Sequence, residues 1–285
     1  MARRPAVAGM FYEAEQDVLL RSIQQCFLSK LGPGRLPQVR QERLGQLVGL
    51  VSPHAGYVYS GAAAAWAYAA LAADGVPDVA VILGPNHRGY GADVAVSVES
   101  EWLTPLGTAK ADVEVAEEIV RRSKYAEEDD LAHTHEHSIE VQIPFLQYVT
   151  GNRTRIVGIC LAHPPKQDAL ALAADLGQAI AGALEGRNAV VIASTDLTHY
   201  ESKASAQAKD ESALEQILKL DGRGLIDVVY EQEITMCGVM GTAVMIEACK
   251  KMGADTARQL AYYTSGDVTG DISQVVGYAA LSIQL

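Results

Sequence analysis

Three apolar segments of the chain each run into a short loop that carries a histidine. They share one order, an apolar run, then a turn, then an imidazole: 47–51 before His54, 79–83 before His87, and 189–193 before His199. Apolar runs this short, bounded by Gly, Pro or Ser, indicate buried strands. In an open α/β sheet, ligands bind beyond the carboxyl ends of the strands. The pattern predicts a sheet whose carboxyl edge gathers imidazoles, which favours a metal site.

Strand-like and helix-like patterns alternate along the rest of the chain. Helices are expected over 61–73, 112–122, 138–148, 167–184, 204–220 and 241–252, and further strands over 94–98, 156–160, 259–264 and 275–283. Pro144 should kink or break the third helix. This alternation predicts an α/β fold in which a mainly parallel central sheet is flanked by helices. The only linker-like stretch, 32–37, sets off an N-terminal helix, so residues 1–285 are expected to form a single domain.

Charge and composition narrow the class of protein. A net charge of −12 argues against a nucleic-acid-binding surface, which needs clustered Lys and Arg. No apolar run is long enough to cross a membrane or to act as a secretion signal, so no membrane partner is expected. The four cysteines are scattered without paired spacing, as is typical of reduced thiols. We therefore expect a cytoplasmic enzyme.

The loop histidines are the first candidates for function. His54 and His87 each follow a proline-containing turn, where the ring can stand clear of the strand. Asp196 and His199 are three residues apart and would share one face of a helical turn. A carboxylate beside an imidazole raises its basicity, which suits a general base or the support of a ligand. The alternative is that Asp196 only caps the following turn.

The segment 133–137 is the densest polar cluster. It holds His133, His135, Glu136 and His137. Such a composition is typical of metal binding, although an exposed loop of His and Glu is also an ordinary solvated surface. We expect His135 together with Glu136 or His137 to line the site as acid/base groups or substrate contacts.

Cys237 differs from the other three cysteines. Cys26, Cys160 and Cys249 fall in apolar patterns and are interpreted as small buried hydrophobic residues. Cys237 precedes Gly238 and an expected helix, whose dipole should lower the thiol pKa. A thiolate there would serve as a nucleophile or as a soft metal ligand.

Several of these segments together carry a family resemblance. They are Ser-Pro-His-Ala-Gly-Tyr (52–57), Leu-Gly-Pro-Asn-His (83–87), Glu-His-Ser-Ile-Glu (136–140), Ser-Thr-Asp-Leu-Thr-His-Tyr (194–200) and Cys-Gly (237–238). The chain resembles the Memo family, which is similar in fold to the class III extradiol (LigB-like) non-haem iron dioxygenases. The resemblance implies that His54 and His87 are metal ligands and that His199 is the acid/base residue with Asp196 near it. It places Cys237 where the dioxygenases have a carboxylate ligand.

The thiol changes the chemistry that the resemblance implies. Two histidines and a carboxylate suit Fe(II) and oxygen, whereas a thiolate softens the site toward copper or zinc, or alters the state of iron. We expect iron or copper, with zinc as the alternative, and redox or oxygen chemistry on an unknown small molecule that contacts Tyr57, Glu136 and His137. A non-catalytic module that binds a ligand or peptide in the same pocket is the other hypothesis. The resemblance also implies radical-SAM and AMMECR1-like proteins as partners.

Overall fold

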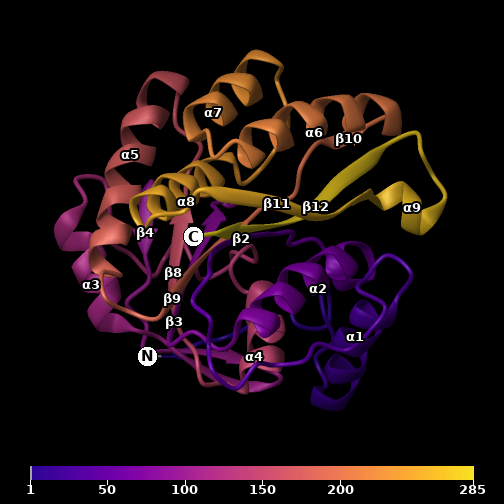
Figure 1. Ribbon diagram of the computed structural model, residues 1–285, viewed down its shortest axis with the longest axis horizontal. Coiled ribbons are helices and arrows are strands. Elements are labelled where there is room, and N and C mark those ends of the chain that lie inside the picture. The colour runs from indigo at the N-terminus through magenta and orange to yellow at the C-terminus, as the bar shows by residue number, and fades with distance from the viewer. Residues whose placement is uncertain (1) are drawn as a thin grey trace.

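The computed structural model describes residues 2–285, and a nine-stranded sheet runs through its centre (Figure 1). Four parallel strands form its middle: β2 (Leu47–Ser52), β9 (Ala189–Ser194), β3 (Val79–Pro85) and β8 (Arg155–Leu161). Beyond β8 come β4 (Val94–Val96), which is antiparallel to it, and β7 (Glu127–Glu128). The predicted α/β fold is confirmed, and the three strands that end in histidine loops are adjacent at its centre.

The C-terminal strand closes the sheet on the other side of β2. The strand β12 (Val275–Gln284) runs antiparallel to β2, with Leu281 opposite Val51. Two further antiparallel strands pair with β12: β10 (His199–Glu201) and β11 (Thr256–Thr264). The strand that carries His54 is therefore held between a parallel and an antiparallel neighbour.

Helices cover both faces of the sheet. One face carries α3 (Val113–Arg122), α5 (Lys166–Ala183), α6 (Lys203–Leu218), α7 (Gly222–Glu231) and α8 (Val239–Lys251), and the other carries α1 (Gln16–Leu28), α2 (Tyr57–Asp74) and α4 (Gln142–Thr150). Side chains of a strand point alternately to its two faces. Accordingly, Val81 and Leu83 of β3 join one hydrophobic core, while Ala80 and Ile82 join the other. Because both faces are buried, the central strands are almost wholly apolar.

Two of the expected helix starts were wrong, and both differences affect the site. The helix α2 begins at Tyr57 rather than at 61, and Ser60 lies inside it, donating a hydrogen bond to the Ala55 carbonyl. The helix α4 begins at Gln142, so residues 138–141 lie ahead of it. Pro144 therefore falls in the first turn, where its missing N–H costs no helical hydrogen bond.

Short elements that the sequence pattern missed complete the chain. A three-stranded sheet joins β1 (Ala2–Arg3), β5 (Glu101–Thr104) and β6 (Gly107–Lys110), and α9 (Ser265–Thr269) follows β11. The strand β1 runs parallel to β5, with Arg3 opposite Trp102. This pairing fixes the start of the chain beside the segment 133–140. No helix among the described residues is long and apolar enough to span a bilayer.

Candidate metal centre

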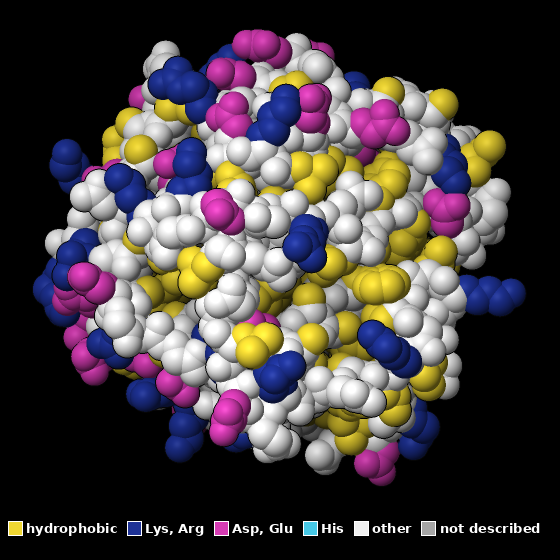
Figure 2. All heavy atoms as spheres, viewed as in Figure 1, with side chains coloured by type: hydrophobic (Ala, Val, Ile, Leu, Met, Phe, Trp, Pro, Cys, Tyr) yellow, Lys and Arg dark blue, Asp and Glu magenta, His cyan; other side chains and the backbone are white. Residues whose placement is uncertain are grey.

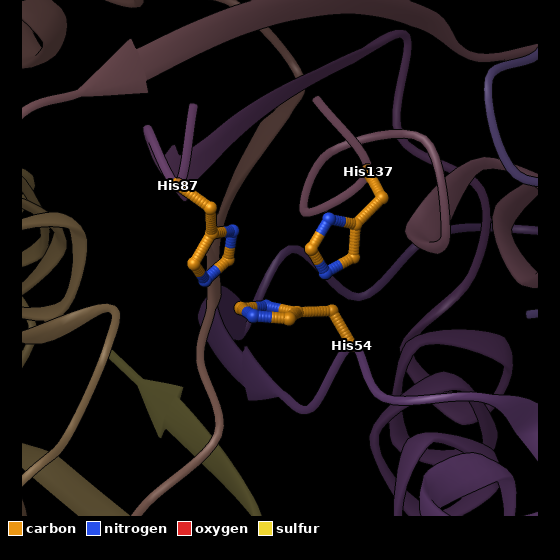
Figure 3. Close-up of side chains that lie close together, drawn as sticks. All are labelled: His54, His87 and His137. Carbon is orange, nitrogen blue, oxygen red and sulfur yellow. The ribbon is translucent and has the colours of Figure 1, made fainter. Parts of the chain in front are cut away.

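Three imidazoles converge beyond the carboxyl ends of β2 and β3. One ring nitrogen each from His54, His87 and His137 lies within 4.8 Å of the other two (Figure 3). The centroids of the His87 and His137 rings are 4.7 Å apart, and both rings lie edge to face with the His54 ring. His54 and His87 come from strand ends, as predicted. His137, expected to contact substrate, instead completes the group of potential ligands.

Each of the three rings is oriented by a partner on its Nδ1 atom. His54 Nδ1 is 2.9 Å from Ser194 Oγ, and His87 Nδ1 is 2.9 Å from Glu136 Oε1. His137 Nδ1 lies 3.1 Å from the same carboxylate oxygen. Partners of this kind fix the tautomer of a ligating histidine and raise its basicity. The three rings face one another in Figure 3, and His54 Nε2 also lies 3.3 Å from Cys237 Sγ.

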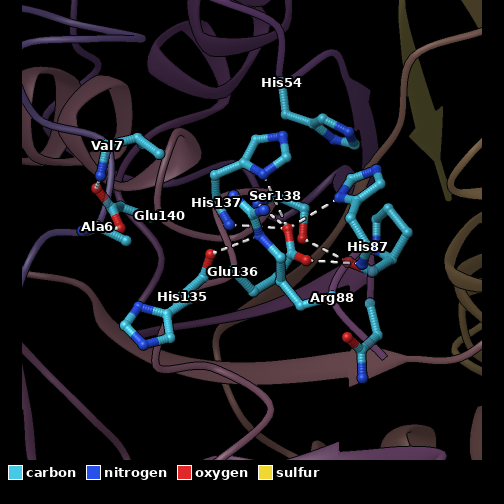
Figure 4. Close-up of polar contacts among 12 residues, drawn as sticks. Ala6, Val7, His54, His87, Arg88, His135, Glu136, His137, Ser138 and Glu140 are labelled. Carbon is cyan, nitrogen blue, oxygen red and sulfur yellow. Dashed lines mark hydrogen bonds and ion pairs between the residues drawn. The ribbon is translucent and has the colours of Figure 1, made fainter. Parts of the chain in front are cut away.

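Glu136 is the common support of two of the rings (Figure 4). Its Oε2 accepts the backbone N–H of His87 at 2.7 Å, and its Oε1 accepts those of His137 at 2.7 Å and Ser138 at 2.9 Å. Burial alone would raise the pKa of this carboxyl, but the hydrogen bonds from His137 and His87 hold the pKa well below its ordinary value. Glu136 is therefore an ionised anchor under the imidazoles.

A glycine allows β3 and the segment that carries Glu136 to approach each other. A Cβ atom at Gly84 would lie 2.4 Å from Ser138 Oγ and 3.0 Å from its Cβ, closer than side chains pack. Ser138 Oγ instead donates to the Pro85 carbonyl at 2.9 Å. This contact brings the loop of His87 onto Glu136.

The start of the chain fastens the segment 133–140 in place. Arg3 Nε donates to the His133 carbonyl at 2.9 Å, and Nη2 donates to the Glu136 carbonyl at 2.6 Å. Arg3 Nη1 also pairs with Glu140 Oε2 at 2.8 Å, and the guanidinium lies 4.4 Å from the centre of the Trp102 ring. The Glu140 carboxylate further accepts hydrogen bonds from Ala6 N, Val7 N and the Tyr12 hydroxyl. Arg3 thus holds the backbone on which Glu136 and His137 are carried.

The three imidazoles differ in their access to solvent. His54 is 2% exposed, whereas the side chain of His87 is 30% exposed. Burial, with the neighbouring rings of His137 and His87, lowers the pKa of His54 well below its ordinary value. A metal needs neutral imidazole, so His54 is in the state that ligation requires. The site opens to solvent on the His87 side.

Cys237 lies beside the three histidines but outside their group. Its Sγ is 3.3 Å from His54 Nε2 and accepts the Asp196 N–H at 3.3 Å. The expectation of a lowered thiol pKa was wrong: desolvation, followed by the charge of Asp196, raises the pKa of Cys237 well above its ordinary value. The helix α8 begins two residues later, at Val239, and its dipole does not overcome these effects. Binding of a metal by this sulfur would have to displace the thiol proton.

Asp196 contacts the His54 loop, whereas His199 lies outside the group of converging imidazoles. The Asp196 carboxylate accepts the backbone N–H of His54 at 2.9 Å, and burial raises the pKa of this carboxyl. No helix follows it, so the alternative of a helix cap does not hold; Asp196 fixes the His54 loop. His199 begins β10 and its Nδ1 is 2.8 Å from the Thr235 carbonyl, which leaves Nε2 free for a proton.

The other candidates lie away from the convergence point. His135 is exposed, its backbone carbonyl accepts a bond from Arg88 Nε, and its ring stands apart from the other imidazoles in Figure 4. Tyr57 is buried, with its hydroxyl donating to the Val141 carbonyl at 2.8 Å. The structure therefore brings together six predicted residues: His54, His87, Glu136, His137, Asp196 and Cys237.

The supporting residues Ser194, Arg3 and Glu140 were missed by sequence reasoning. Ser194 ends β9, in the same motif as Asp196 and His199, so its position at the sheet edge was a usable signal. Glu140 closes the Glu-His-Ser-Ile-Glu motif, but nothing local indicates that it meets Arg3 across 137 residues of chain.

The fold and the site define an α/β protein with a candidate metal centre of three supported imidazoles at the carboxyl edge of its sheet. A family model described as "Memo-like protein" matches residues 3–282. A MEMO1 family protein of Methanopyrus kandleri is 49% identical over 99% of this chain and 98% of its own. Corresponding proteins of Methanothermobacter thermautotrophicus and Nitrosopumilus maritimus are 47% and 42% identical, each over 99% of this chain and 100% and 99% of their own. The chain belongs to the Memo family.

Proposed function

We propose that this protein is a metal-dependent enzyme for redox or oxygen chemistry on a small molecule, with His54, His87 and His137 as ligands of iron or copper. The observation that carries the proposal is the convergence of three ring nitrogens within 4.8 Å, each ring supported at its other nitrogen. Three protein ligands leave coordination positions open, the arrangement of a catalytic rather than a structural site.

The donor set fits a redox metal. Imidazole nitrogen suits iron, copper and zinc, and a neighbouring thiol adds preference for softer ions. Cys237 Sγ, 3.3 Å from His54 Nε2, is placed to join the ligands after losing its proton. A bound iron or copper ion would supply electron transfer and the activation of oxygen. Zinc is the alternative, and it would support only Lewis-acid chemistry.

The residues around the centre have separate tasks in this proposal. His199 presents Nε2 as the group that takes up or releases a proton, because its Nδ1 is engaged with Thr235. Asp196 holds the His54 loop through the backbone, and Glu136 keeps two imidazoles in orientation. His199→Ala should abolish turnover and spare metal binding, because His199 is not among the three converging imidazoles.

The test is anaerobic purification of the full chain, followed by elemental analysis and electron paramagnetic resonance. We expect about one equivalent of iron or copper, lost in a His87→Ala/His137→Ala double variant. Oxygen uptake with candidate substrates then separates an enzyme from the second hypothesis, a ligand- or peptide-binding module that uses the same pocket. A chain that takes up no iron, copper or zinc under these conditions would contradict the proposal.

The second hypothesis has one observation in its favour. Cys237 Sγ and His54 Nε2 are within hydrogen-bonding distance of each other, so this pair has a stable arrangement without an ion. A module of this kind would bind its ligand equally well with and without metal. The radical-SAM and AMMECR1-like proteins implied by the resemblance are the partners to test first with purified components.

A further inference from the structure

A cavity of about 640 Å³ lies beside the metal centre, between the N-terminal segment, α1, α2 and the region of α9. Residues 9–13 form one wall, and Cys26, Tyr57 and Ala62 line the helical side. The volume is typical of small-molecule sites, and mostly apolar walls are their usual lining. None of the three converging histidines lines this cavity, so it is a separate space.

Aromatic rings supply much of the wall, and their polar ends are already occupied. The hydroxyl of Tyr12 donates to Glu140 at 2.6 Å, that of Tyr57 to the Val141 carbonyl at 2.8 Å, and that of Tyr263 to the Tyr59 carbonyl at 2.8 Å. Their hydroxyls are paired to protein groups and each residue is only 4–6% exposed, so these tyrosines present no free polar group to the cavity. The lining therefore favours ring-containing, apolar ligands over highly polar ones.

Large apolar side chains also surround the cavity where it meets solvent. Met10 and Val58 are each 72% exposed, and Tyr59 and Val268 are exposed beside them. Figure 2 shows hydrophobic side chains gathered over α1 and α2 on the face drawn. Exposed apolar residues that collect around one opening mark a binding site more often than singly scattered ones do.

The charges of the lining do not select an ion. Glu13 and Lys30 bring one charge of each sign, and the third charged residue, Asp267, is paired with Lys203 at 2.5 Å. A ligand with a net charge would gain little there, so a neutral molecule fits best.

Phe11 connects the cavity to the metal centre. Its side chain belongs to the lining, and its ring lies 4.6 Å, centroid to centroid, from the ring of His137. The Phe11 carbonyl accepts the N–H of Tyr57 at 2.8 Å, which ties this wall to the start of α2. One aromatic side chain is thus shared between the cavity and a potential metal ligand.

We propose that this cavity binds a neutral, ring-containing small molecule and holds it against Phe11, next to the histidines. The inference rests on the proposed function, since the cavity adjoins the metal centre through Phe11 and would hold the substrate of that centre. The ligand would gain burial of its apolar surface and ring–ring contacts, while the opening past Met10 and Val58 gives it entry.

The direct test is a fluorescence titration of the full chain at pH 7 with 2-naphthol, a neutral two-ring probe. Saturable binding is expected in the wild type, and Ala62→Phe should weaken it at least tenfold by filling the cavity. Ala70→Phe, at another partly buried alanine of α2 that lies outside the lining, is the matched control and should bind as the wild type does. Ser22→Phe, on the α1 wall, is the second filling variant should Ala62→Phe fail to fold.

Two results would overturn the proposal: no saturable binding to the wild type, or undiminished binding to a folded filling variant. With Mn²⁺ as the probe metal, proton signals of bound 2-naphthol should broaden, and His87→Ala/His137→Ala should remove this broadening. Broadening that persists in the double variant would refute the placement beside the histidines. A chain that binds 2-naphthol but takes up no iron, copper or zinc would support the cavity and contradict the metal-dependent function, so the two failures are distinguishable.

Discussion

The metal centre is assembled from two kinds of backbone. His54 and His87 stand on loops at the ends of central strands, whereas His137 lies in the segment 133–140, ahead of α4. The positions of the strand-end loops are fixed by the sheet, because its strands are buried on both faces. The segment 133–140 is instead held by side chains from elsewhere, above all Arg3 and, through it, Glu140. The position of a histidine ligand can therefore be fixed either by the hydrophobic core or by a few buried polar contacts.

The largest effect should follow from breaking the contacts of Arg3. Arg3→Met leaves the Glu140 carboxylate buried without its cation, and losing one partner of such a pair costs about 3–5 kcal/mol of unfolding free energy. Metal affinity should fall as well, because the Glu136 carbonyl loses its anchor. Arg43→Met is the matched control: it breaks the buried pair with Asp74 at the opposite edge of the sheet. Urea unfolding and metal titration should show lost stability in both variants and lost affinity only in Arg3→Met.

Removal of His137, the ligand in the segment 133–140, should lower metal affinity strongly. We expect His137→Ala to lower metal affinity by more than about 100-fold, beyond the range typical of supporting residues. His135→Ala removes an exposed ring two residues away and should leave affinity unchanged. Competition titrations against a chelator measure both. Equal affinities in the two variants would show that the ligand from this segment has been misassigned.

Supporting groups should matter less than ligands, and Glu136 more than Ser194. Glu136→Gln weakens the orientation of two imidazoles and should cost about 10–100-fold in metal affinity. Ser194→Ala removes the Nδ1 partner of His54, together with hydrogen bonds to Gln142 Nε2 and the Ser138 carbonyl. The sheet still holds the His54 loop, so we expect a loss of about tenfold at most in metal affinity. The reverse order of effects, in the same competition assay, would mean that the His54 ring depends more on its supporting contact than the rings of His87 and His137 do.

The last effect, a dependence of stability on pH, does not involve the metal ligands. Burial lowers the pKa of His133 to about 4, against 6.5 in the unfolded chain, so the folded state binds its proton less readily. This contribution is fully present above pH 6.5 and is lost as the pH falls toward 4. Between pH 7 and pH 5 the loss should be about 2 kcal/mol. Urea unfolding of the wild type and of His133→Gln at both pH values measures it: the wild type should lose about 2 kcal/mol more than the variant, and equal losses would contradict the assignment.

The same contrast explains what could be predicted from the sequence. Buried strands are short apolar runs with turns behind them, so the loops of His54, His87 and His199 could be placed at the sheet edge without coordinates. The segment 133–140 has no strand pattern, its last three residues were wrongly assigned to a helix, and its place depends on Arg3 near the start of the chain. Its histidines were noticed by composition, but which of them faces the centre could not be deduced: His137 does, while His135 is exposed and His133 packs against Trp102.

The direction of the Cys237 pKa shift was misjudged for a related reason. A helix start is visible in the sequence, and its dipole argues for a lowered pKa. The desolvation around the sulfur and the charge of Asp196 arise only from the tertiary arrangement, and they outweigh the dipole. Local motifs thus located the thiol but not its environment.

The pairing of β12 with β2 has a consequence for how the protein is made. The last ten residues before Leu285 form the antiparallel neighbour of the strand that leads to His54. Until these residues have left the ribosome, this side of β2 is unpaired. The His54 loop is then without the sheet that fixes it, although His87 and His137 have long since emerged. We therefore expect a complete set of metal ligands only after β12 has paired with β2, so that the cell must deliver the ion after residues 275–284 have been made.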